Sequence, residues 1–378
     1  MTEIYLIRHT QAEGNLYRMM QGQWDGDVTE LGLKQIDALA ERFKDIHIDA
    51  VYSSDLYRAW KTATAVTRYN GLEIIKRPAL RELDMGAWET KYFGNVFHEY
   101  PEMLKTFLVD PESWKVEGSE TCRDVVDRIY PELLELAKAH EGQSIAVVSH
   151  GLAIRCLLSA LLDKPLSDRS LPICDNTAVS KFIYENGHFE PVYINDASHL
   201  KAVGVPEWHK TRDLRDEPFN PADDPDWYVD CYKDAWLFSK GSTKGFNADT
   251  YFGAALKHYA ANPGSVMKIL DRDTPVGLID LDVERGEGDG YGWITLLYLI
   301  PEYRSKGYGM QLLSRAMFFY RRLGRGALRL TVNSSNTEAF DFYERNGFEQ
   351  LEPADGNGVI LMEKKLGGKI DVWTAGKD

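Results

Sequence analysis

Two kinds of hydrophobic pattern alternate along the first half of the chain. Short apolar runs with the length and β-branched content of buried strands lie at residues 4–7, 50–53 and 144–148. Longer segments repeat apolar residues at helical spacing, at residues 29–43, 56–69, 122–139 and 152–162. Strands that alternate with helices over about 195 residues predict an α/β fold with a mostly parallel sheet, covered by helices on both faces.

The second half of the chain has a different order of elements. Its helical segments lie at 248–261, 310–322 and 337–345. Its apolar strands lie at 266–270, 276–283, 293–300, 327–332 and 359–363. Because several strands follow one another without an intervening helix, we expect a separate α+β domain built on a central sheet.

A change of composition separates the two patterns. Between residues 197 and 225, four prolines stand among acidic residues: Pro206, Pro218, Pro221 and Pro225. Proline stiffens a chain and charged side chains favour water, so this stretch is predicted to be an extended linker. It would join a first domain at 1–196 to a second at 226–368, followed by a tail at 369–378. The alternative is a long surface loop inside one domain.

Composition and charge limit the classes of function. The 378 residues suffice for two or three domains, and 44% apolar with 27% charged residues is typical of a globular protein. The net charge, 44 − 58 = −14, disfavours general binding to nucleic acid or to anionic membranes, so a phosphate site must be a local positive pocket. The four cysteines form no CxxC motif, and the chain has neither a long apolar run nor a signal-peptide pattern. These features lead us to expect a cytoplasmic protein.

Two histidines stand where predicted strands end. The first strand runs into Arg8-His9, and a later one runs into His150-Gly151 before a helix. In open α/β sheets, ligands bind beyond the carboxyl ends of strands, and the free amide groups at a helix N-terminus attract anions. A single histidine at such a place is more often structural. Two of them indicate a phosphate site at this edge of the sheet.

The motifs around these histidines resemble those of one family. They are Leu6-Ile7-Arg8-His9, Asn15, Gln21-Gly22, Ser53-Ser54-Asp55-Leu56-Tyr57-Arg58-Ala59, Leu80-Arg81-Glu82 and Val148-Ser149-His150-Gly151. With these motifs, residues 1–196 resemble the histidine phosphatase superfamily, which has the phosphoglycerate-mutase-like fold. The resemblance implies a reaction on a small-molecule phosphate ester that needs no metal and no cofactor in this domain.

The resemblance also implies a role for each matched residue. His9 would be the nucleophile that becomes phosphohistidine, and Arg8 and Arg58 would clamp the phosphoryl oxygens. His150 would stabilise the transferring group, and Glu82 would protonate the leaving alcohol, a role that favours a carboxyl pKa raised by burial. The residues implied in phosphate binding are Arg8, Asn15, Gln21, Gly22, Arg58, His150 and Gly151.

Thr10 departs from the family pattern, in which a glycine follows the Arg-His pair. Glycine lets the backbone approach the phosphate closely, whereas Thr10 adds a β-branched side chain. Its hydroxyl could bond a phosphate oxygen instead. The departure leaves open a domain that binds phosphate ligands without hydrolysing them.

The segment after the acid motif bears on the choice between mutase and phosphatase. A mutase must hold a second acidic group, which the family's mutases do with a longer, basic insertion. Residues 83–118 contain three lysines, no arginine and seven acids. They also contain seven aromatic residues, which we expect partly in the core and partly in a lid over an apolar or aromatic alcohol. This composition favours phosphomonoester hydrolysis.

A second candidate site follows the predicted strand at 293–300. There Arg304-Ser305-Lys306-Gly307-Tyr308-Gly309 opens a helix, and a glycine-containing loop of this kind can wrap its amides around a diphosphate. Asn336, Phe342-Tyr343 and Asn346-Gly347-Phe348 follow. Together these motifs resemble the GNAT family, the GCN5-related acyl-CoA N-acetyltransferases, over residues 226–366.

This resemblance implies that the second domain binds acetyl-CoA. Strands splayed after residue 300 would accept the pantetheine arm, and Tyr343 would protonate the departing thiolate; the alternative for Tyr343 is a packed aromatic. The acceptor would be an unknown amine, whose base no motif identifies, because acids at 284–289 are more typical of a solvated hairpin. The residues implied in acetyl-CoA binding are Leu299, Arg304, Ser305, Lys306, Gly307, Tyr308, Gly309 and Asn336.

Three interpretations of the whole chain remain. We favour a bifunctional enzyme, a phosphatase joined to an acetyltransferase, because both sets of chemical residues are present. In the second interpretation, the acyl-CoA module is a noncatalytic sensor that regulates the phosphatase. In the third, the first domain only binds phosphorylated ligands. A phosphoglycerate-mutase-type phosphotransferase is a further alternative for that domain.

Overall fold

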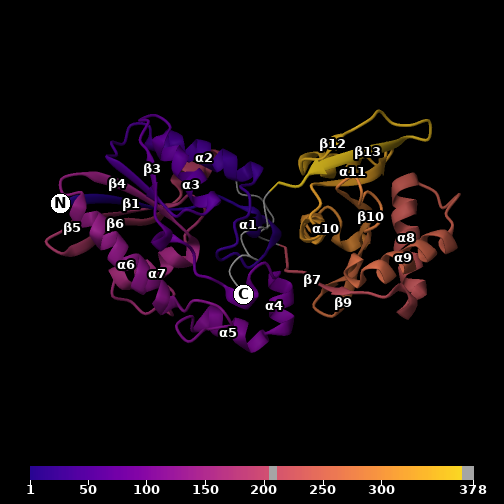
Figure 1. Ribbon diagram of the computed structural model, residues 1–378, viewed down its shortest axis with the longest axis horizontal. Helices are drawn as coiled ribbons and strands as arrows, with labels where there is room; N and C mark the ends of the chain where they lie inside the picture. Colours follow the sequence, from indigo (N-terminus) through magenta and orange to yellow (C-terminus); the bar gives the residue numbers. More distant parts are fainter. Residues whose placement is uncertain (204–210, 368–378) are drawn as a thin grey trace. The chain divides into compact units, whose positions relative to one another are not determined.

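The computed structural model of the chain describes residues 1–203 and 211–367. These residues belong to two compact units, one up to residue 203 and one from residue 211 (Figure 1). Each unit has its own sheet and is described by itself. The predicted tail at 369–378 lies outside the described residues.

The first unit is built on a six-stranded sheet. Its strands are β1 (Thr2–Arg8), β2 (Ala50–Ser53), β3 (Ile74–Lys76), β4 (Ser144–Ser149), β5 (Val179–Glu185) and β6 (His188–Asp196). They lie in the order β3-β2-β4-β1-β5-β6. The first four in this order are parallel, and β5 and β6 are antiparallel. The predicted mostly parallel sheet is therefore confirmed.

Both faces of this sheet are buried, which explains why its central strands are continuously apolar. In β1, Ile4 and Leu6 point into one hydrophobic core, and Tyr5 and Ile7 point into another. Figure 1 shows helices on both sides of the sheet. For the first core they are α6 (Cys122–Ala139) and α7 (Gly151–Leu161), and for the second α2 (Glu30–Phe43) and α3 (Tyr57–Thr67).

Several shorter helices were not predicted from the sequence. They have one to three turns, too few for a hydrophobic period to stand out. They are α1 (Glu13–Tyr17), α4 (Phe93–Glu99) and α5 (Pro101–Val109), with the 3-10 turns η1 (Pro78–Leu80), η2 (Gly86–Trp88) and η3 (Ser198–Ala202).

The second unit has a seven-stranded sheet. Its strands are β7 (Arg215–Pro218), β8 (Val266–Asp271), β9 (Thr274–Asp282), β10 (Tyr291–Leu299), β11 (Ala327–Asn333), β12 (Glu349–Gln350) and β13 (Val359–Lys365). They lie in the order β12-β13-β11-β10-β9-β8-β7, and β10 with β11 is the parallel pair. The helices are α8 (Pro225–Lys240), α9 (Ala248–Ala261), α10 (Gly309–Arg322) and α11 (Thr337–Arg345).

The parallel pair β10 and β11 separates along its length. The strands are paired from Tyr291 to Trp293, and the register of β10 against β9 shifts between Ile294 and Leu296. A β-bulge at this point bends the strand and ends its pairing with β11. The splay therefore begins at Ile294, inside the strand, and the prediction that it follows residue 300 was wrong.

The predicted linker was wrong at both of its ends. Ser198–Ala202 packs on α2 of the first unit, where His199 contacts Arg42. Arg215–Pro218 pairs with β8 as an edge strand, a place where proline is tolerated. Within this strand, Asp216 is ion-paired with Arg315 and Glu217 with Arg215. Residues 204–210 of the predicted linker lie outside the described residues.

The helix α8 was not predicted from the sequence, because its first residues are proline and aspartate, which are also typical of loops. Pro225 is its first residue, a position where the missing N–H costs nothing, and Asp224 caps the helix by accepting a hydrogen bond from Trp227 N. Pro-Asp sequences of this kind mark a helix start as well as a loop.

Candidate functional site

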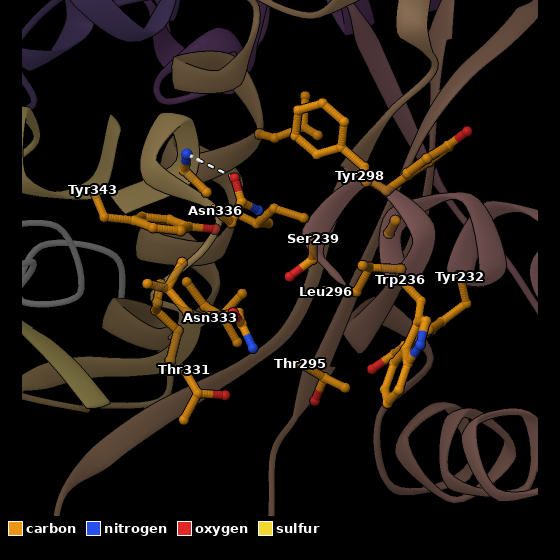
Figure 2. Close-up of a pocket in the computed structure, with 18 of the residues that line it drawn as sticks. Tyr232, Trp236, Ser239, Thr295, Leu296, Tyr298, Thr331, Asn333, Asn336 and Tyr343 are labelled. Carbon is orange, nitrogen blue, oxygen red and sulfur yellow. Dashed lines mark hydrogen bonds between the residues drawn. The ribbon is translucent and has the colours of Figure 1, made fainter. Parts of the chain in front are cut away.

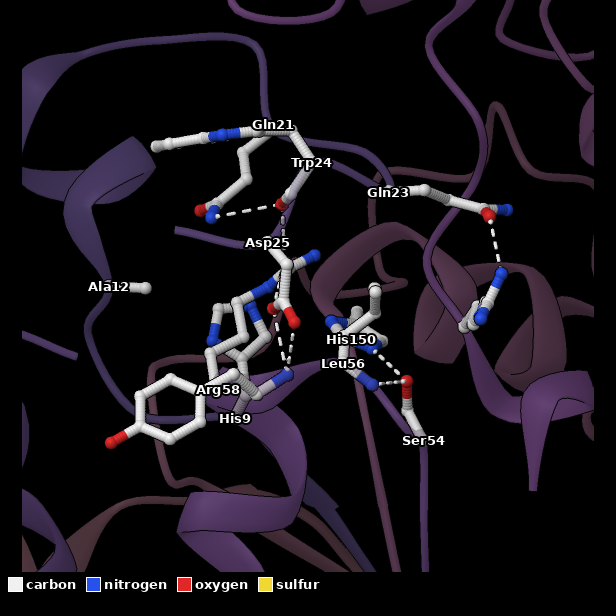
Figure 3. A network of polar contacts seen from close by, with 12 residues as sticks. His9, Ala12, Gln21, Gln23, Trp24, Asp25, Ser54, Leu56, Arg58 and His150 are labelled. Atoms are coloured by element: carbon white, nitrogen blue, oxygen red, sulfur yellow. Dashed lines mark hydrogen bonds and ion pairs between the residues drawn. The ribbon is translucent and has the colours of Figure 1, made fainter. Parts of the chain in front are cut away.

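The sheet topology brings the two predicted histidines together. β1 and β4 are parallel neighbours with Arg8 opposite Ser149, so the next residues, His9 and His150, lie at the same edge. Their ring centroids are 5.1 Å apart (Figure 3). Both rings are buried, with residue exposures of 3% and 0%.

The His9 ring has a defined proton position. Its Nδ1 lies 2.6 Å from the carbonyl oxygen of Thr10, which can only accept, so Nδ1 carries the proton and Nε2 has the lone pair. Burial lowers the pKa of His9 well below its usual value, and the positive charges of Arg58 and Arg8 lower it further. The ring is therefore a neutral imidazole with a nucleophilic Nε2.

His150 is oriented by the strand next to its own. Its Nε2 lies 2.8 Å from Oγ of Ser54, which follows β2 (Figure 3). Its buried Nδ1 has no partner among the described residues. Burial and the nearby arginines hold the pKa of His150 well below its usual value. This ring can thus offer a hydrogen bond from Nδ1 to a bound ligand.

Two guanidinium groups complete the positive site. Arg58 is fully buried and donates to the carbonyl oxygens of Trp24 (2.9 Å) and Gly22 (2.6 Å). Arg8 donates to the carbonyl oxygen of Cys174. The Nε atoms of both are buried without a partner among the described residues, and burial lowers the pKa of both groups. Desolvated, partly unpaired guanidinium groups fit an anionic ligand.

The sequence suggested that the amide groups at the start of α7 are free to bind an anion. In the structure, two of them already donate to a side chain. The carboxylate of Glu82 accepts hydrogen bonds from Ala153 N (2.8 Å) and Leu152 N (3.1 Å). Gly151 instead provides space, because a Cβ there would lie 3.1 Å from Arg8 Nε. The helix start therefore positions an acid, and the adjacent glycine admits an arginine.

The backbone around Glu82 is held in place by Arg128, a residue for which the sequence gave no indication. Arg128 donates to the carbonyl oxygens of Ala79, Arg81 and Glu82, at 2.8, 2.8 and 2.9 Å. It is also paired with Glu120 at 2.8 Å. Its position on the amphipathic helix α6 gave no sequence signal, because a charged residue there is normally solvent-exposed.

The remaining predicted phosphate-binding residues have local contacts in the segments before α2. Asn15 caps α1 by accepting from Ala12 N at 3.1 Å. Gln21 donates weakly to the Trp24 carbonyl oxygen at 3.5 Å (Figure 3). A Cβ on Gly22 would lie 2.3 Å from the carbonyl oxygen of Leu83, so the backbone there is closely packed. Gln21 and Gly22 thus belong to the loop that receives Arg58.

Thr10 does not direct its hydroxyl to the ligand side. The hydroxyl donates to the carbonyl oxygen of Gly32 at 2.7 Å, and it lies 3.0 Å from Oε1 of Gln35. The residue is fully buried. The expected bond from Thr10 to a phosphate oxygen is therefore wrong, because α2 supplies the partners of this side chain.

We expect Thr10→Val to destabilise the chain by about 1–3 kcal/mol, because a methyl group replaces a buried hydroxyl that donates to the Gly32 carbonyl oxygen. Chemical unfolding of the full chain, followed by circular dichroism, measures the change. Thr10→Ser keeps the hydroxyl and is the matched control. Equal stability of the Val and Ser variants would contradict the role of the hydroxyl.

The second unit contains a cavity of about 880 Å³ between the splayed strands. β10 contributes Thr295 and Leu296 to its wall, and β11 contributes Thr331 and Asn333 (Figure 2). Leu299 also lies on the wall. The bulge in β10 thus opens a space that a fully paired sheet would fill.

Tyr343 extends from α11 into this cavity with its hydroxyl foremost (Figure 2). Burial raises the pKa of Tyr343 above its ordinary value, so the hydroxyl keeps its proton. Asn336 also lies on the wall and caps α11 by accepting from Ala339 N at 3.1 Å. A protonated phenol at this position can donate to a leaving group.

The predicted diphosphate loop is only partly available. Arg304 is ion-paired with Asp234 and donates to the Leu299 carbonyl oxygen, and Ser305 is bonded to Glu338. Lys306 is exposed, whereas Tyr308 is buried and packs on Tyr303. The loop residues on the cavity wall are Arg304, Ser305, Gly307 and Gly309.

The backbone of this loop requires its glycines. Gly307 has a φ of 84°, a conformation that other residues rarely adopt. A Cβ on Gly309 would lie 3.0 Å from the ring of Phe342. The cavity and this narrow loop fit an extended thioester such as acetyl-CoA, with Arg304 held beside the helix start by Asp234.

The family relations follow from comparison with known proteins. The family model of the histidine phosphatase superfamily (branch 1) matches residues 4–197, which is about half of the chain. The chain belongs to this superfamily. A second model, of the acetyltransferase (GNAT) family, matches residues 210–348, so a GNAT domain follows the histidine phosphatase domain.

Curated relatives and a solved structure resemble about half of the chain. Phosphoserine phosphatase 1 of Hydrogenobacter thermophilus is 33% identical over 210 residues, which are 56% of this chain and 99% of that protein. The probable phosphoglycerate mutase GpmB of Enterobacter sp. strain 638 is 31% identical over 213 residues, 55% of this chain and 99% of that protein. The structure of Bacillus stearothermophilus YhfR has a TM-score of 0.52 at 29% identity, covering 53% of this chain and 100% of that one.

Three of the aromatic residues after the acid motif of the histidine phosphatase domain pack against one another in its core. The ring of Trp88 packs on Trp114 at 5.3 Å, and Phe107 packs on Trp114 at 5.0 Å. Both tryptophans are fully buried. Phe97, in contrast, is 63% exposed. The expected core packing is therefore confirmed for Trp88, Phe107 and Trp114, and the lid formed by others of these residues stays a prediction.

Two functional neighbours in the histidine phosphatase domain were missed. Asn176 donates to the carbonyl oxygen of His9 at 3.0 Å, and Ser54 orients His150. Ser54 lies within the Ser53–Ala59 motif, which could have indicated it. Asn176 precedes β5, far along the chain from His9, and has no local signal.

Among the described residues, no helix is long and apolar enough to cross a membrane.

Proposed function

We propose that the histidine phosphatase domain hydrolyses small phosphate monoesters through a phosphohistidine intermediate on His9. The observation that carries this proposal is the pair of buried imidazoles, 5.1 Å apart at adjacent strand ends and next to Arg8 and Arg58. A neutral nucleophile beside two cations is what transfer of a phosphoryl group requires.

The reaction has two steps, each balanced in atoms. In the first, Nε2 of His9 attacks phosphorus, the ester P–O bond breaks, and Glu82 gives a proton to the leaving alkoxide. In the second, water attacks phospho-His9, Glu82 takes its proton, and the N–P bond breaks to release inorganic phosphate. Arg8, Arg58 and the Nδ1 of His150 would stabilise the charge on the equatorial oxygens in both steps.

Hydrolysis is favoured over mutase chemistry by the surroundings of Glu82. A mutase must bind the second acidic group of its substrate, which needs free cations near the site. In the segment 83–118, Lys91 is paired with Glu99 at 2.7 Å, and Lys105 and Lys115 are exposed. Arg128 is engaged by carbonyl oxygens and Glu120.

An assay of the purified full chain tests this proposal. We expect release of inorganic phosphate from 4-nitrophenyl phosphate in the presence of EDTA. Phosphoserine and 3-phosphoglycerate are the first natural esters to test, because relatives carry phosphatase and mutase names. Interconversion of 3- and 2-phosphoglycerate without phosphate release would instead establish a mutase. Vanadate binding without turnover of any of these esters would indicate a phosphate-binding domain.

We further propose that the GNAT domain transfers an acetyl group from acetyl-CoA to an amine, which makes the chain bifunctional. The specific observation in favour is the cavity between β10 and β11 with the protonated hydroxyl of Tyr343 on its wall. In this proposal, the thioester lies between the strands and Tyr343 supplies the proton of the released thiol.

Tyr343→Phe is expected to lower the kcat for thiol release from acetyl-CoA by about 100-fold, because the phenol is lost as a proton donor. The Kd for acetyl-CoA, measured by calorimetry, should change little. Tyr259→Phe, a tyrosine of the same unit outside the cavity wall, is the control. An unchanged kcat would identify Tyr343 as a packing residue. Acetyl-CoA binding without turnover by the natural sequence would favour a sensing module.

A further inference from the structure

A buried polar chain reaches the cavity of the GNAT domain from the side of α8 and α9. Asp280, on β9, is fully buried and has both carboxylate oxygens engaged. Oδ2 accepts from the hydroxyl of Tyr228 at 2.7 Å, and Oδ1 lies 2.7 Å from Nδ1 of His258. No sequence motif marked these three residues, which come from α8, β9 and α9.

Asp280 determines which nitrogen of the His258 ring carries the proton. A carboxylate only accepts, so Nδ1 carries the proton of that hydrogen bond. The other nitrogen, Nε2, is then the atom free to take a second proton. It lies 3.5 Å from Oδ2 of Asp282. The geometry is that of an imidazole oriented by one acid and facing a second.

Asp282 is itself held in place by the turn that follows β9. Its Oδ1 accepts from the backbone N–H groups of Glu284 (3.2 Å) and Arg285 (3.0 Å). Oδ2 is left to face the imidazole. Both His258 and Asp282 lie on the cavity wall, the same cavity into which Tyr343 extends.

The charges around His258 make it a stronger base than an isolated histidine. Burial lowers the pKa of His258, but the hydrogen bond and charge of Asp280, with the charge of Asp282, outweigh this effect and raise it. The charged and titratable groups around the ring are Tyr228 from α8 and the two aspartates from β9, with Arg285 on the same cavity wall.

Aromatic side chains cover the neighbouring wall. Tyr232 and Trp236 from α8 lie on it together with Tyr251 from α9 (Figure 2 labels the first two). The rings of Tyr232 and Tyr251 are stacked with their centroids 4.2 Å apart. The ring centroids of Trp236 and Tyr251 are 5.7 Å apart. A cation with an aromatic or apolar body can therefore bind with its charge at Asp282 and its body against these rings.

We propose that Nε2 of His258 accepts the proton of the acetyl acceptor, and that this acceptor is a primary amine with an aromatic or apolar body. Asp280 positions the ring, and Asp282 attracts the ammonium form. The inference rests on the proposed acetyltransferase activity of the GNAT domain. It adds a base and an acceptor class, which no sequence motif identified.

The step balances as follows. The ammonium group loses one proton to water, and the resulting amine attacks the thioester carbonyl carbon. The C–N bond forms, the C–S bond breaks, Nε2 of His258 takes the second amine proton, and Tyr343 gives its proton to the thiolate. Exchange with water returns both side chains to their starting protonation. The products are an N-acetyl amine and free CoA thiol.

The hairpin acids considered from the sequence do not fit this role. Glu287 is paired with Arg325 at 2.9 Å, and Glu284 and Asp289 are exposed. None of the three is on the cavity wall. Glu284→Gln is therefore a matched control, since this substitution removes one negative charge two residues from Asp282.

The test compares His258→Asn with Glu284→Gln in the full chain, using acetyl-CoA with 2-phenylethylamine or spermidine and a thiol-release assay. Asparagine can keep a donor for Asp280 but has no proton acceptor in place of Nε2. We expect kcat/KM for 2-phenylethylamine to fall about 100-fold in His258→Asn, with loss of the acidic limb of the pH profile. Glu284→Gln should retain both, and acetyl-CoA binding, measured by calorimetry, should persist in both variants.

The outcomes separate this inference from the proposed activity. If the natural sequence does not bind acetyl-CoA, the acetyltransferase proposal itself fails. If it acetylates 2-phenylethylamine and His258→Asn keeps the rate and pH profile, His258 is not the base. Acetyl-CoA binding with a preference for spermidine, or with turnover of neither amine, would overturn the acceptor class.

Discussion

His9→Ala is expected to abolish phosphate release from 4-nitrophenyl phosphate, with a loss of kcat of at least about 10³-fold. The reason is that the variant removes the atom that forms the covalent intermediate, while Arg8 and Arg58 remain to bind the ester. The neutral state of the ring, which burial and both arginines maintain, is what makes Nε2 nucleophilic. Phosphate release by the full chain in EDTA is the measurement.

A second readout examines the intermediate directly. The natural sequence, quenched in alkali after mixing with a phosphorus-32-labelled ester, should carry acid-labile label, and His9→Ala should carry none. His188→Ala is the matched control, because His188 is exposed at the start of β6. Equal turnover by His9→Ala and the natural sequence would reject the phosphohistidine mechanism. Labelling of His9 without phosphate release would show a phosphotransferase that lacks the water step.

Glu82→Gln is expected to have an effect that depends on the leaving group. With an alkyl phosphate such as phosphoserine, kcat should fall about 10²–10⁴-fold, because the alkoxide then leaves without a proton. With 4-nitrophenyl phosphate the loss in the first step should be much smaller, since the phenolate is a good leaving group. The two esters, compared in one assay, provide the measurement.

The structure provides the control for this prediction. Glu82 accepts from Leu152 and Ala153 at the start of α7, so the amide in Glu82→Gln loses at least one of these contacts. Thermal unfolding of the variant separates that loss from the loss of the acid. Glu117→Gln, an exposed acid of the same segment, should leave both rates unchanged. Equal losses with the two esters would exclude Glu82 as the acid of the first step.

Local pattern predicted most of the regular elements because their periods are local properties. The run 144–148 became β4 and the helical spacing at 122–139 became α6, because burial on two faces or on one leaves a direct record in the sequence. The exceptions were short or ambiguous. The 3-10 turns and α4 have too few residues to show a period, and Pro225 is equally typical of a loop and of a helix start.

For the candidate sites, too, local motifs indicated some features and tertiary contacts decided the others. The sequence by itself indicated His9, His150 and Tyr343 as candidate catalytic residues, since they stand in recognisable motifs. Only the tertiary structure decided which groups are free to act. In the structure, the Thr10 hydroxyl donates to the Gly32 carbonyl oxygen, amide groups at the start of α7 donate to Glu82, and Arg304 is ion-paired with Asp234. His258 and Asp280 met because α9 packs on β9. Such pairings depend on contacts between segments far apart in the chain, and no local pattern of residues records them.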